Sequence, residues 1–315
     1  MSGAPAPDAP PSQREGRSDE TWRVHAALLG AQAGFALFPI IGKLVLPAIP
    51  ALVLAAFRVV AAALILEGVR RLARARELEP RHRPAVLLYA LLGVSFNQML
   101  FILGLSMTSA IHTTILTATI PVFTLAVAVI LGRERLTARG LMAVCLATAG
   151  VLVLLDVGHV RLAGGTLRGD LLILANSLSY SCYLVLARPI LAIYPVSTVV
   201  SRIFVYGAVP ILLVASPGLL RFKPSAVPAY AWGGAAAIVL LCTVAPYLWN
   251  SWSLARTEAS KVAFYVFLQP LIAAVLAVLV LRETFAARTG VAAALIFAGL
   301  GVSAVRRGPQ AASPR

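Results

Sequence analysis

The chain has 315 residues, of which 60% are hydrophobic and only 12% are charged, and its mean hydropathy is +0.88. This composition excludes an ordinary soluble globular domain and indicates an integral membrane protein. The net charge of +15 does not indicate a nucleic-acid binder, because the cationic residues lie between apolar runs and not on one amphipathic face.

Ten apolar runs follow one another along the chain, each about 17–25 residues long, which is enough to cross a hydrocarbon core of about 30 Å as a helix. We predict transmembrane helices near residues 24–46, 51–69, 86–107, 110–132, 138–156, 170–191, 197–219, 229–252, 259–281 and 290–306. Residues 1–22 are rich in Ala, Pro, Ser and charge and are expected to form a disordered tail. No cleavable signal peptide precedes the first run, so it is expected to be retained as a helix.

The segment from Thr108 to Gly150 recurs as Thr257 to Gly299 at a constant offset of 149 residues, with 13 of 43 positions identical. The matches include a proline in mid-segment (Pro121 and Pro270) and an Arg-Glu pair (Arg133-Glu134 and Arg282-Glu283). A shared apolar composition would not place an Arg-Glu pair at the same point of both segments. The chain is therefore predicted to contain two homologous halves.

The distribution of cationic residues predicts how the helices are oriented. With the N-terminus in the cytoplasm, 18 Lys and Arg residues lie in inner segments or at inner helix ends and 7 lie outside. This excess places both termini in the cytoplasm. Each half holds an odd number of helices, five, so the second half must begin on the outer face and the repeat must be inverted.

From the N-terminus to the C-terminus, the predicted organisation consists of a disordered cytoplasmic tail (1–22), a first five-helix repeat (23–157), a periplasmic or external linker (158–169), a second five-helix repeat (170–306) and a cytoplasmic C-terminal tail (307–315).

Ten helices in two inverted fives, with a proline in mid-helix and an apolar run ending in Glu in each half, resemble the EamA-type transporters of the drug/metabolite transporter superfamily. The resemblance covers residues 24–306. Its most specific part is Phe96-Asn97-Gln98 through Gly104-Leu105, Thr108-Ser109-Ala110, Pro121-Val122-Phe123-Thr124 and Gly132-Arg133-Glu134. The resemblance implies export or uptake of small metabolites by alternating access, with a central cavity between the halves.

Polar and aromatic side chains in the middle of the helices are the candidates for lining such a cavity, because polar groups at that depth need partners in another helix or in a wet cavity. For the amides, interhelical bonding and cavity lining remain equally good interpretations. Tyr180 and Tyr183 lie too deep for an interfacial belt, and Tyr247 and Asn250 are three residues apart on one helix face. The candidates are Asn97, Gln98, Thr117, Tyr180, Tyr183, Tyr247, Asn250 and Gln269.

Prolines inside three of the predicted helices are candidates for bends beside the cavity. Pro39, Pro121 and Pro270 each lack an N–H and free a carbonyl one turn earlier.

Two arginines, Arg58 and Arg202, lie inside apolar helices, where a charge costs about 2.5–3.5 kcal/mol on insertion scales. Anion or substrate binding is one interpretation, and a structural role is the other, which we favour. The symmetry of the halves predicts the structural ion pairs Arg58–Glu283 and Arg202–Glu134.

These features predict a secondary transporter of small organic metabolites, an exporter or exchanger, in the bacterial inner (plasma) membrane. An intramembrane enzyme or a channel-like protein is the alternative, but the helices carry no mid-membrane carboxylate, metal triad or nucleophile with its base. No cofactor, metal or nucleic-acid partner is expected, and the protein is expected to be a monomer or a homodimer in the lipid bilayer. Small multidrug relatives in this superfamily carry a membrane-embedded glutamate in the first helix, and this chain has none there. This argues against proton coupling by that route, so exchange or facilitated diffusion is at least as well supported as proton coupling.

Overall fold

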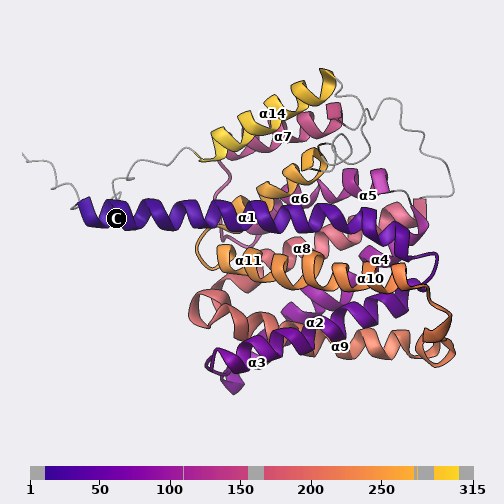
Figure 1. The fold of residues 1–315 in the computed structure, drawn as a ribbon. Coiled ribbons are helices and arrows are strands. Elements are labelled where there is room, and N and C mark those ends of the chain that lie inside the picture. Colours follow the sequence, from indigo (N-terminus) through magenta and orange to yellow (C-terminus); the bar gives the residue numbers. More distant parts are fainter. Residues whose placement is uncertain (1–10, 109, 155–166, 273–274, 276–286, 305–315) are drawn as a thin grey trace, which may run out of the picture.

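The computed structural model describes residues 11–108, 110–154, 167–272, 275 and 287–304. Regular secondary structure within these residues is helical, with no β-strand. The helices lie side by side in one bundle, and α1 runs across its middle (Figure 1). The predicted all-helical fold is confirmed in this form.

The first half of the chain runs from α1 to α7. Its α-helices are α1 Pro11–Val45, α2 Ala51–Leu72, α3 Arg83–Ala90, α4 Asn97–Met107, α5 Ala110–Thr117, α6 Ile120–Ile130 and α7 Ala138–Leu154. The 3-10 turn η1 (Pro80–His82) leads into α3, and the π-helical turn η2 (Leu91–Phe96) joins α3 to α4. The predicted third helix is therefore one continuous helical path with a change of hydrogen-bond register in its middle.

The second half follows the same plan. Its α-helices are α8 Leu167–Ile193, α9 Val196–Arg221, α10 Ala229–Val239, α11 Ala245–Leu254, α12 Ala259–Phe264 and α14 Ala287–Ala304. The 3-10 turn η4 (Pro224–Ala226) precedes α10, the π-helical turn η5 (Leu240–Val244) joins α10 to α11, and the 3-10 turn η6 (Tyr265–Phe267) follows α12. Prolines 50, 195 and 228 stand at the N-caps of α2, α9 and α10, where the missing N–H breaks no helical hydrogen bond.

The N-terminal helix is longer than the sequence predicts. Helix α1 begins at Pro11, so helix replaces the predicted disordered tail from residue 11 onward. The physical reason is that a helix already formed by the apolar run extends at little cost into the good helix formers Gln13, Arg14 and Glu15. Residues 1–10 of that tail lie outside the described residues.

Six helices among the described residues are long and apolar enough to cross a membrane. They are Glu20–Val45, Ala51–Leu72, Pro80–Met107, Leu167–Ile193, Val196–Arg221 and Ala229–Leu254. Four shorter apolar helical stretches, Ile120–Ile130, Ala138–Gly150, Ala259–Ile272 and Gly290–Val302, accompany them.

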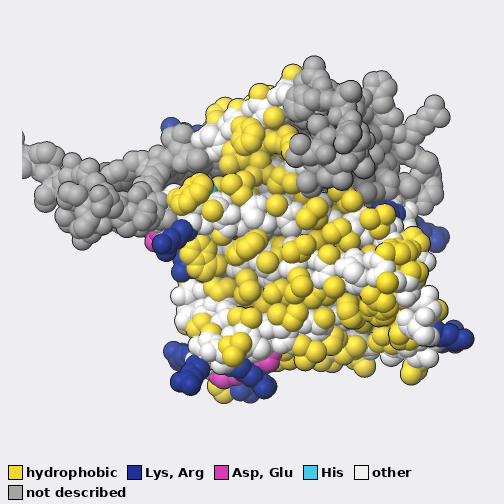
Figure 2. Space-filling model, in the orientation of Figure 1, with side chains coloured by type: hydrophobic (Ala, Val, Ile, Leu, Met, Phe, Trp, Pro, Cys, Tyr) yellow, Lys and Arg dark blue, Asp and Glu magenta, His cyan; other side chains and the backbone are white. Residues whose placement is uncertain are grey.

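The outer surface suits a lipid environment. Large apolar side chains such as Leu64, Leu213 and Ile130 are 71%, 71% and 80% exposed. Figure 2 shows hydrophobic side chains across the middle of one face, with Lys and Arg gathered toward its two ends. An apolar belt between two charged rims is the pattern that a bilayer selects.

The helices pair across the two halves of the chain. Helix α2 packs on α9, and α7 packs on α14, which lie side by side at one edge of the bundle (Figure 1). Helix α4 packs on α8, and α1 packs on α11 and α10. The two halves are therefore interleaved, and the centre of the bundle is built from both.

Small residues allow α7 and α14 to approach closely. A Cβ added at Gly150 would lie 2.9 Å from the carbonyl oxygen of Ala292, and one added at Gly299 would lie 2.8 Å from the carbonyl oxygen of Ala143. Gly150 and Gly299 are the equivalent residues that end the two copies of the sequence repeat. Close backbone contact at small residues is a principal source of helix association in membranes, because lipid tails remove the hydrophobic driving force.

A cluster of charges ties the end of α2 to the start of α9. The Arg202 guanidinium lies 2.6 Å from Glu77 Oε1 and 3.5 Å from Glu67 Oε2, while Arg70 lies 2.7 Å from Glu67 and 2.8 Å from Glu77. Ser201 also donates to Glu67 Oε2 at 2.8 Å. The hydrogen bond from Arg202 is the main reason that the pKa of Glu77 lies below its ordinary value of 4.5.

The α7–α14 contact gives a first prediction. Gly299→Leu forces the two helices apart and destabilises the protein by about 1–3 kcal/mol, the usual range for overpacking. Gly301→Leu on the same helix is the control, because a Cβ there meets nothing within 4 Å. Thermal unfolding in detergent should therefore show a lower Tm for Gly299→Leu alone, and equal Tm values for the two variants would contradict this packing.

The charge cluster gives a second prediction. Arg202→Gln leaves Glu67 and Glu77 with one cation fewer and lowers stability by about 1–2 kcal/mol at neutral pH. The pKa of Glu77 is lowered in the folded protein, so the ionised carboxylate stabilises the fold fully above pH 4.5. This stabilisation is lost as the pH falls through the pKa that Glu77 has in the folded protein. The Tm difference between native protein and Arg202→Gln should thus shrink on acidification.

Arg221→Gln is the matched control for this experiment. Arg221 is exposed at the opposite end of the same helix. A loss of Tm in Arg221→Gln as large as that in Arg202→Gln, or a difference that grows at acid pH, would contradict the assignment.

Candidate functional site

Two π-helical turns stand at equivalent places in the two halves. Turn η2 begins at Leu91 and η5 begins at Leu240, and these residues differ by the same 149 positions as the sequence repeat. A π-helical turn inserts an extra residue into the helical ladder, changes which side chains face inward and recurs at functional sites. The residues after the two turns, Asn97 and Gln98 on α4 and Tyr247 on α11, meet in the centre of the bundle.

A cavity occupies this centre, with about 700 Å³ of empty space including the part open to solvent. Its walls come from α1, α2, α4, α5 and α6 of the first half and from α8, α11 and the segment around η6 of the second. The lining residues are Gln32, Phe35, Ala36, Phe38, Pro39, Arg58, Asn97, Gln98, Phe101, Thr114, Thr117, Ile120, Asn176, Tyr180, Tyr247, Val266 and Gln269. A concave space that is mostly apolar with a few convergent polar groups is typical of a small-molecule site.

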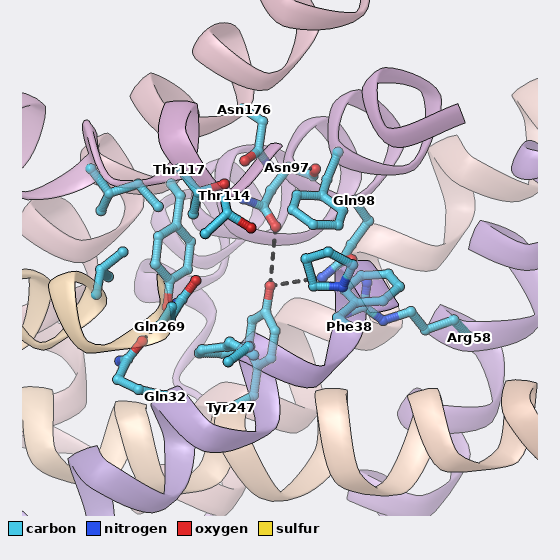
Figure 3. Close-up of a pocket in the computed structure, with 17 residues that line it drawn as sticks. Gln32, Phe38, Arg58, Asn97, Gln98, Thr114, Thr117, Asn176, Tyr247 and Gln269 are labelled. Atoms are coloured by element: carbon cyan, nitrogen blue, oxygen red, sulfur yellow. Dashed lines mark hydrogen bonds between the residues drawn. The ribbon is translucent and has the colours of Figure 1, made fainter. Parts of the chain in front are cut away.

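The Tyr247 hydroxyl forms hydrogen bonds with several polar groups in the centre of the bundle. Gln98 Nε2 donates to its hydroxyl at 2.8 Å, and the hydroxyl donates to the carbonyl of Gly93 at 2.9 Å, with Asn97 Oδ1 at 3.2 Å (Figure 3). Gln98 and Tyr247 are separated by 149 residues and are therefore equivalent positions of the two halves. The symmetry of the sequence thus brings one residue into contact with its own counterpart.

Two more amide pairs join helices around the same space. Gln269 Nε2 donates to Gln32 Oε1 at 2.7 Å, and Asn176 Nδ2 donates to the carbonyl of Asn97 at 2.7 Å. All four of these side chains line the cavity. The predicted amides therefore both bond helices together and line a cavity, so the two interpretations of the sequence do not exclude each other.

Most of the predicted cavity residues line the cavity, and two stand behind it. Asn97, Gln98, Thr117, Tyr180, Tyr247 and Gln269 are in the wall. Asn250 is behind the wall and donates to the Tyr180 hydroxyl at 3.0 Å, while the Tyr183 hydroxyl lies 3.3 Å from Ser251 Oγ. Asn250 therefore positions Tyr180, which lines the cavity, and Tyr183 contacts the neighbouring helix α11. Neither Asn250 nor Tyr183 forms part of the cavity wall.

The predicted bends coincide with irregular backbone at two of the three prolines. Helix α5 ends at Thr117, four residues before Pro121, and the 3-10 turn η6 ends three residues before Pro270. Both interruptions lie where the proline ring collides with the carbonyl four residues earlier. Helix α1 stays helical through Pro39, which lines the cavity.

Arg58 faces the cavity from α2 and is 2% exposed. Its Nε donates to Thr243 Oγ1 at 2.6 Å and its Nη2 to the carbonyl of Cys242 at 3.2 Å. The guanidinium carbon lies 3.9 Å from the centre of the Phe38 ring, and Figure 3 shows the side chain extending toward that ring. Glu283, its predicted partner, lies outside the described residues.

Arg202 has other partners than the one the sequence suggests. Its carboxylate partners are Glu67 and Glu77, whereas Glu134 Oε1 accepts from the backbone N–H of Ser260 at 3.2 Å. The reason is geometric: α9 packs along α2, so the carboxylates at the end of α2 and just beyond it lie closest to Arg202.

Several lining residues were missed by reasoning from the sequence. Gln32 and Asn176 are amides in the middle of apolar helices, so the rule that found Gln98 and Gln269 could also have found them. Phe35, Phe38, Phe101 and Val266 carried no such signal, because an apolar side chain faces lipid, core or cavity with the same sequence pattern. The helix pairing alone turns them inward.

Two known proteins of similar sequence are named uncharacterized transporters. An uncharacterized transporter of Archaeoglobus fulgidus is 29% identical over 201 residues, which cover 62% of this chain and 66% of that protein. The uncharacterized transporter YyaM of Bacillus subtilis is 26% identical over 197 residues, covering 58% and 62%. The matched region thus spans just under two thirds of the length of these two relatives. The protein WALLS ARE THIN 1 of Arabidopsis thaliana is 26% identical over 328 residues, covering 89% and 82%.

The fold also matches a solved crystal structure, with a TM-score of 0.72 at 19% identity, over 91% of this chain and 98% of the other. The sequence model of the EamA-like transporter family matches residues 22–156 and again residues 167–305. Because these two matches cover most of the chain, the protein belongs to the EamA-like transporter family, within the drug/metabolite transporter superfamily.

Proposed function

We propose that the protein is a secondary transporter of small organic metabolites that works by alternating access between two inverted five-helix repeats. The observation that carries this proposal is the central cavity, whose walls come from both halves of the chain. Substrate sites of inverted-repeat transporters lie in this position, between the repeats and near the middle of the membrane.

The pairing of the helices supports an inverted repeat of ten helices. The corresponding helices of the two halves are α1 and α8, α2 and α9, α4 and α11, and α7 and α14. Exchanging each helix for its counterpart leaves the contacts α2–α9 and α7–α14 unchanged and converts the contact α4–α8 into the contact α11–α1. This is the behaviour of a two-fold axis. Together with five apolar segments per half and the excess of inner cationic residues, it favours an axis in the membrane plane and both termini in the cytoplasm.

The cavity is suited to a solute that has polar groups on an apolar body. Amides and hydroxyls come from both halves, and aromatic rings lie between them. The described lining residues include no Asp, Glu or His to carry a proton. We therefore favour export by exchange or facilitated diffusion over proton coupling, in a prokaryotic-type plasma membrane, by a monomer or a homodimer.

Cysteine accessibility tests alternating access. Thr117→Cys places a thiol in the cavity wall with little change of volume, in a background where Cys145 and Cys182 are serine and the buried Cys242 is retained. A membrane-impermeant thiol reagent added to the medium should modify this cysteine through the external opening in right-side-out vesicles and through the cytoplasmic opening in inverted vesicles. The same vesicles should show no potassium conductance through the protein, because the two openings alternate.

Thr124→Cys is the matched control on α6. Thr124 is 0% exposed and does not line the cavity, so its thiol should stay unmodified from both sides. Modification of Thr117→Cys from one face only would refute alternating access. Modification from both faces with a matching ion conductance would indicate a channel.

The mode of coupling is tested in proteoliposomes with the first solute that a thermal-shift screen identifies. Because the described cavity wall has no titratable carboxylate or imidazole, an imposed pH gradient should not drive accumulation, and preloaded solute should accelerate uptake. Accumulation that follows the gradient, and collapses when an uncoupler is added, would refute the uncoupled mechanism.

A further inference from the structure

Arg58 is the one charged side chain among the described residues that line the cavity. It is the eighth residue of α2 and is 2% exposed. A charge buried at this depth is expensive, and such residues in transporters usually mark a substrate or ion pathway.

The hydrogen bonds of Arg58 do not neutralise its charge. Nε and Nη2 donate to Thr243 Oγ1 and to the Cys242 carbonyl, which are neutral acceptors. Phe38 offers only the face of its ring. The third nitrogen, Nη1, is buried and has no hydrogen-bond partner. A guanidinium carries five donors in a fixed fork, so one arm of this fork stays unused.

The orientation of the guanidinium is fixed without any ligand. The Thr243 hydroxyl donates its own proton to the carbonyl of Ile238 at 2.7 Å, so its oxygen is free to accept from Arg58 Nε. Both partners of Arg58 belong to the π-helical turn η5. Turn η5 of the second half therefore presents the arginine of the first half as a preorganised cationic group, a condition that favours binding.

The equivalent arginine of the second half shows what a structural role looks like. Arg202 aligns with Arg58 with one residue of slip and is paired with two carboxylates, Glu67 and Glu77. Arg58 has no carboxylate partner among the described residues. Of the two related positions, only Arg202 is therefore neutralised by residues that the structure describes.

We propose that Arg58 is the anion-recognition residue of the cavity and that the transported solute is an organic carboxylate with an aromatic or other apolar body. This inference rests on the transporter function proposed above. A planar carboxylate matches the fork of a guanidinium, and its single negative charge balances the single cation of the described lining. A phosphate would bring a second negative charge for which the described lining offers no second cation.

The rest of the wall suits the body of such a solute. The rings of Phe35, Phe38, Phe101 and Tyr180 face the cavity, and they offer contact area to an apolar or aromatic group. Figure 3 shows Gln32 and Gln269 on the other side of the cavity from Arg58. They add hydrogen-bonding capacity away from the cation.

Matched pairs of ligands test this proposal on the purified full-length chain. Benzoate, phenylacetate and 3-phenylpropionate are compared with their neutral amides by thermal shift and by isothermal titration calorimetry in detergent at pH 7. Within at least one pair, the carboxylate should bind at least about tenfold more tightly than the amide, because only the carboxylate pairs with the guanidinium. This comparison needs no variant and does not depend on the stability of one.

Substitution of Arg58 then assigns the effect. Arg58→Gln should remove the preference for the carboxylate and leave the affinity for the amide within about twofold, while Arg58→Lys restores part of the preference because it keeps the charge without the planar fork. Arg221→Gln, an exposed arginine outside the cavity, should bind as the native protein does.

Three results would overturn the inference. The first is equal binding of carboxylate and amide in all three pairs, and the second is a carboxylate preference that survives in Arg58→Gln. The third is Arg58-dependent binding of phenyl phosphate tighter than that of every carboxylate.

Bound carboxylate should also slow thiol modification of Thr117→Cys.

These outcomes are separable from failure of the transporter proposal. Alternating access without an Arg58-dependent carboxylate preference would refute the anion site and leave the proposed transport function intact. An Arg58-dependent carboxylate site in a cavity that opens to one face only would support the anion site and refute the proposed transport function.

Discussion

Buried polar groups in a helix bundle surrounded by lipid have only one another for partners, and the centre of this protein is organised by that constraint. The Tyr247 hydroxyl accepts from Gln98, donates to the Gly93 carbonyl and reaches Asn97, so one side chain of the second half satisfies polar groups on the helical path through η2 and α4 of the first. Gln269 also donates to Gln32, and Asn176 donates to the backbone carbonyl of Asn97, so two further bonds join the halves. Because these bonds connect helices that lie far apart in the chain, they fix the relative positions of the halves around a mostly apolar cavity with a few convergent polar groups.

The two halves share a plan but use it unequally. The offset of 149 residues places Gln98 against its counterpart Tyr247, and it places Gly150 and Gly299 in the same close contact of α7 with α14. The π-helical turns η2 and η5 obey the same offset. The arginines do not behave alike, since Arg202 is neutralised by carboxylates at one end of the bundle and Arg58 is directed at the cavity. Equivalent positions give a symmetric scaffold, and the differences between them leave one charged side chain, Arg58, among the described residues that line the cavity.

The elements that could be predicted are those that depend on local sequence. Apolar runs located the helices, since each must satisfy its own backbone within the membrane. Prolines located two of the interruptions, and polar side chains at depth identified six of the lining residues. The predicted tail was misjudged from residue 11 onward, because helix propagation outweighed its polar composition. The partner of Arg202 was misjudged because symmetry of sequence does not say which carboxylate the packing brings near. Phe35, Phe38 and Phe101 were beyond prediction, since an apolar residue does not record which apolar surface it meets.

The sequence by itself determined that this chain is an all-helical membrane protein with two related halves, because hydropathy and repetition are properties of a linear string. The tertiary structure alone decided which helices pair, and therefore which side chains share the central cavity. It also decided the surroundings of the two arginines, because packing determines whether a carboxylate of the described residues lies within reach of a buried cation. For Arg202 the packing of α9 on α2 supplies one, and for Arg58 the π-helical turn η5 supplies only neutral acceptors and leaves Nη1 without a partner.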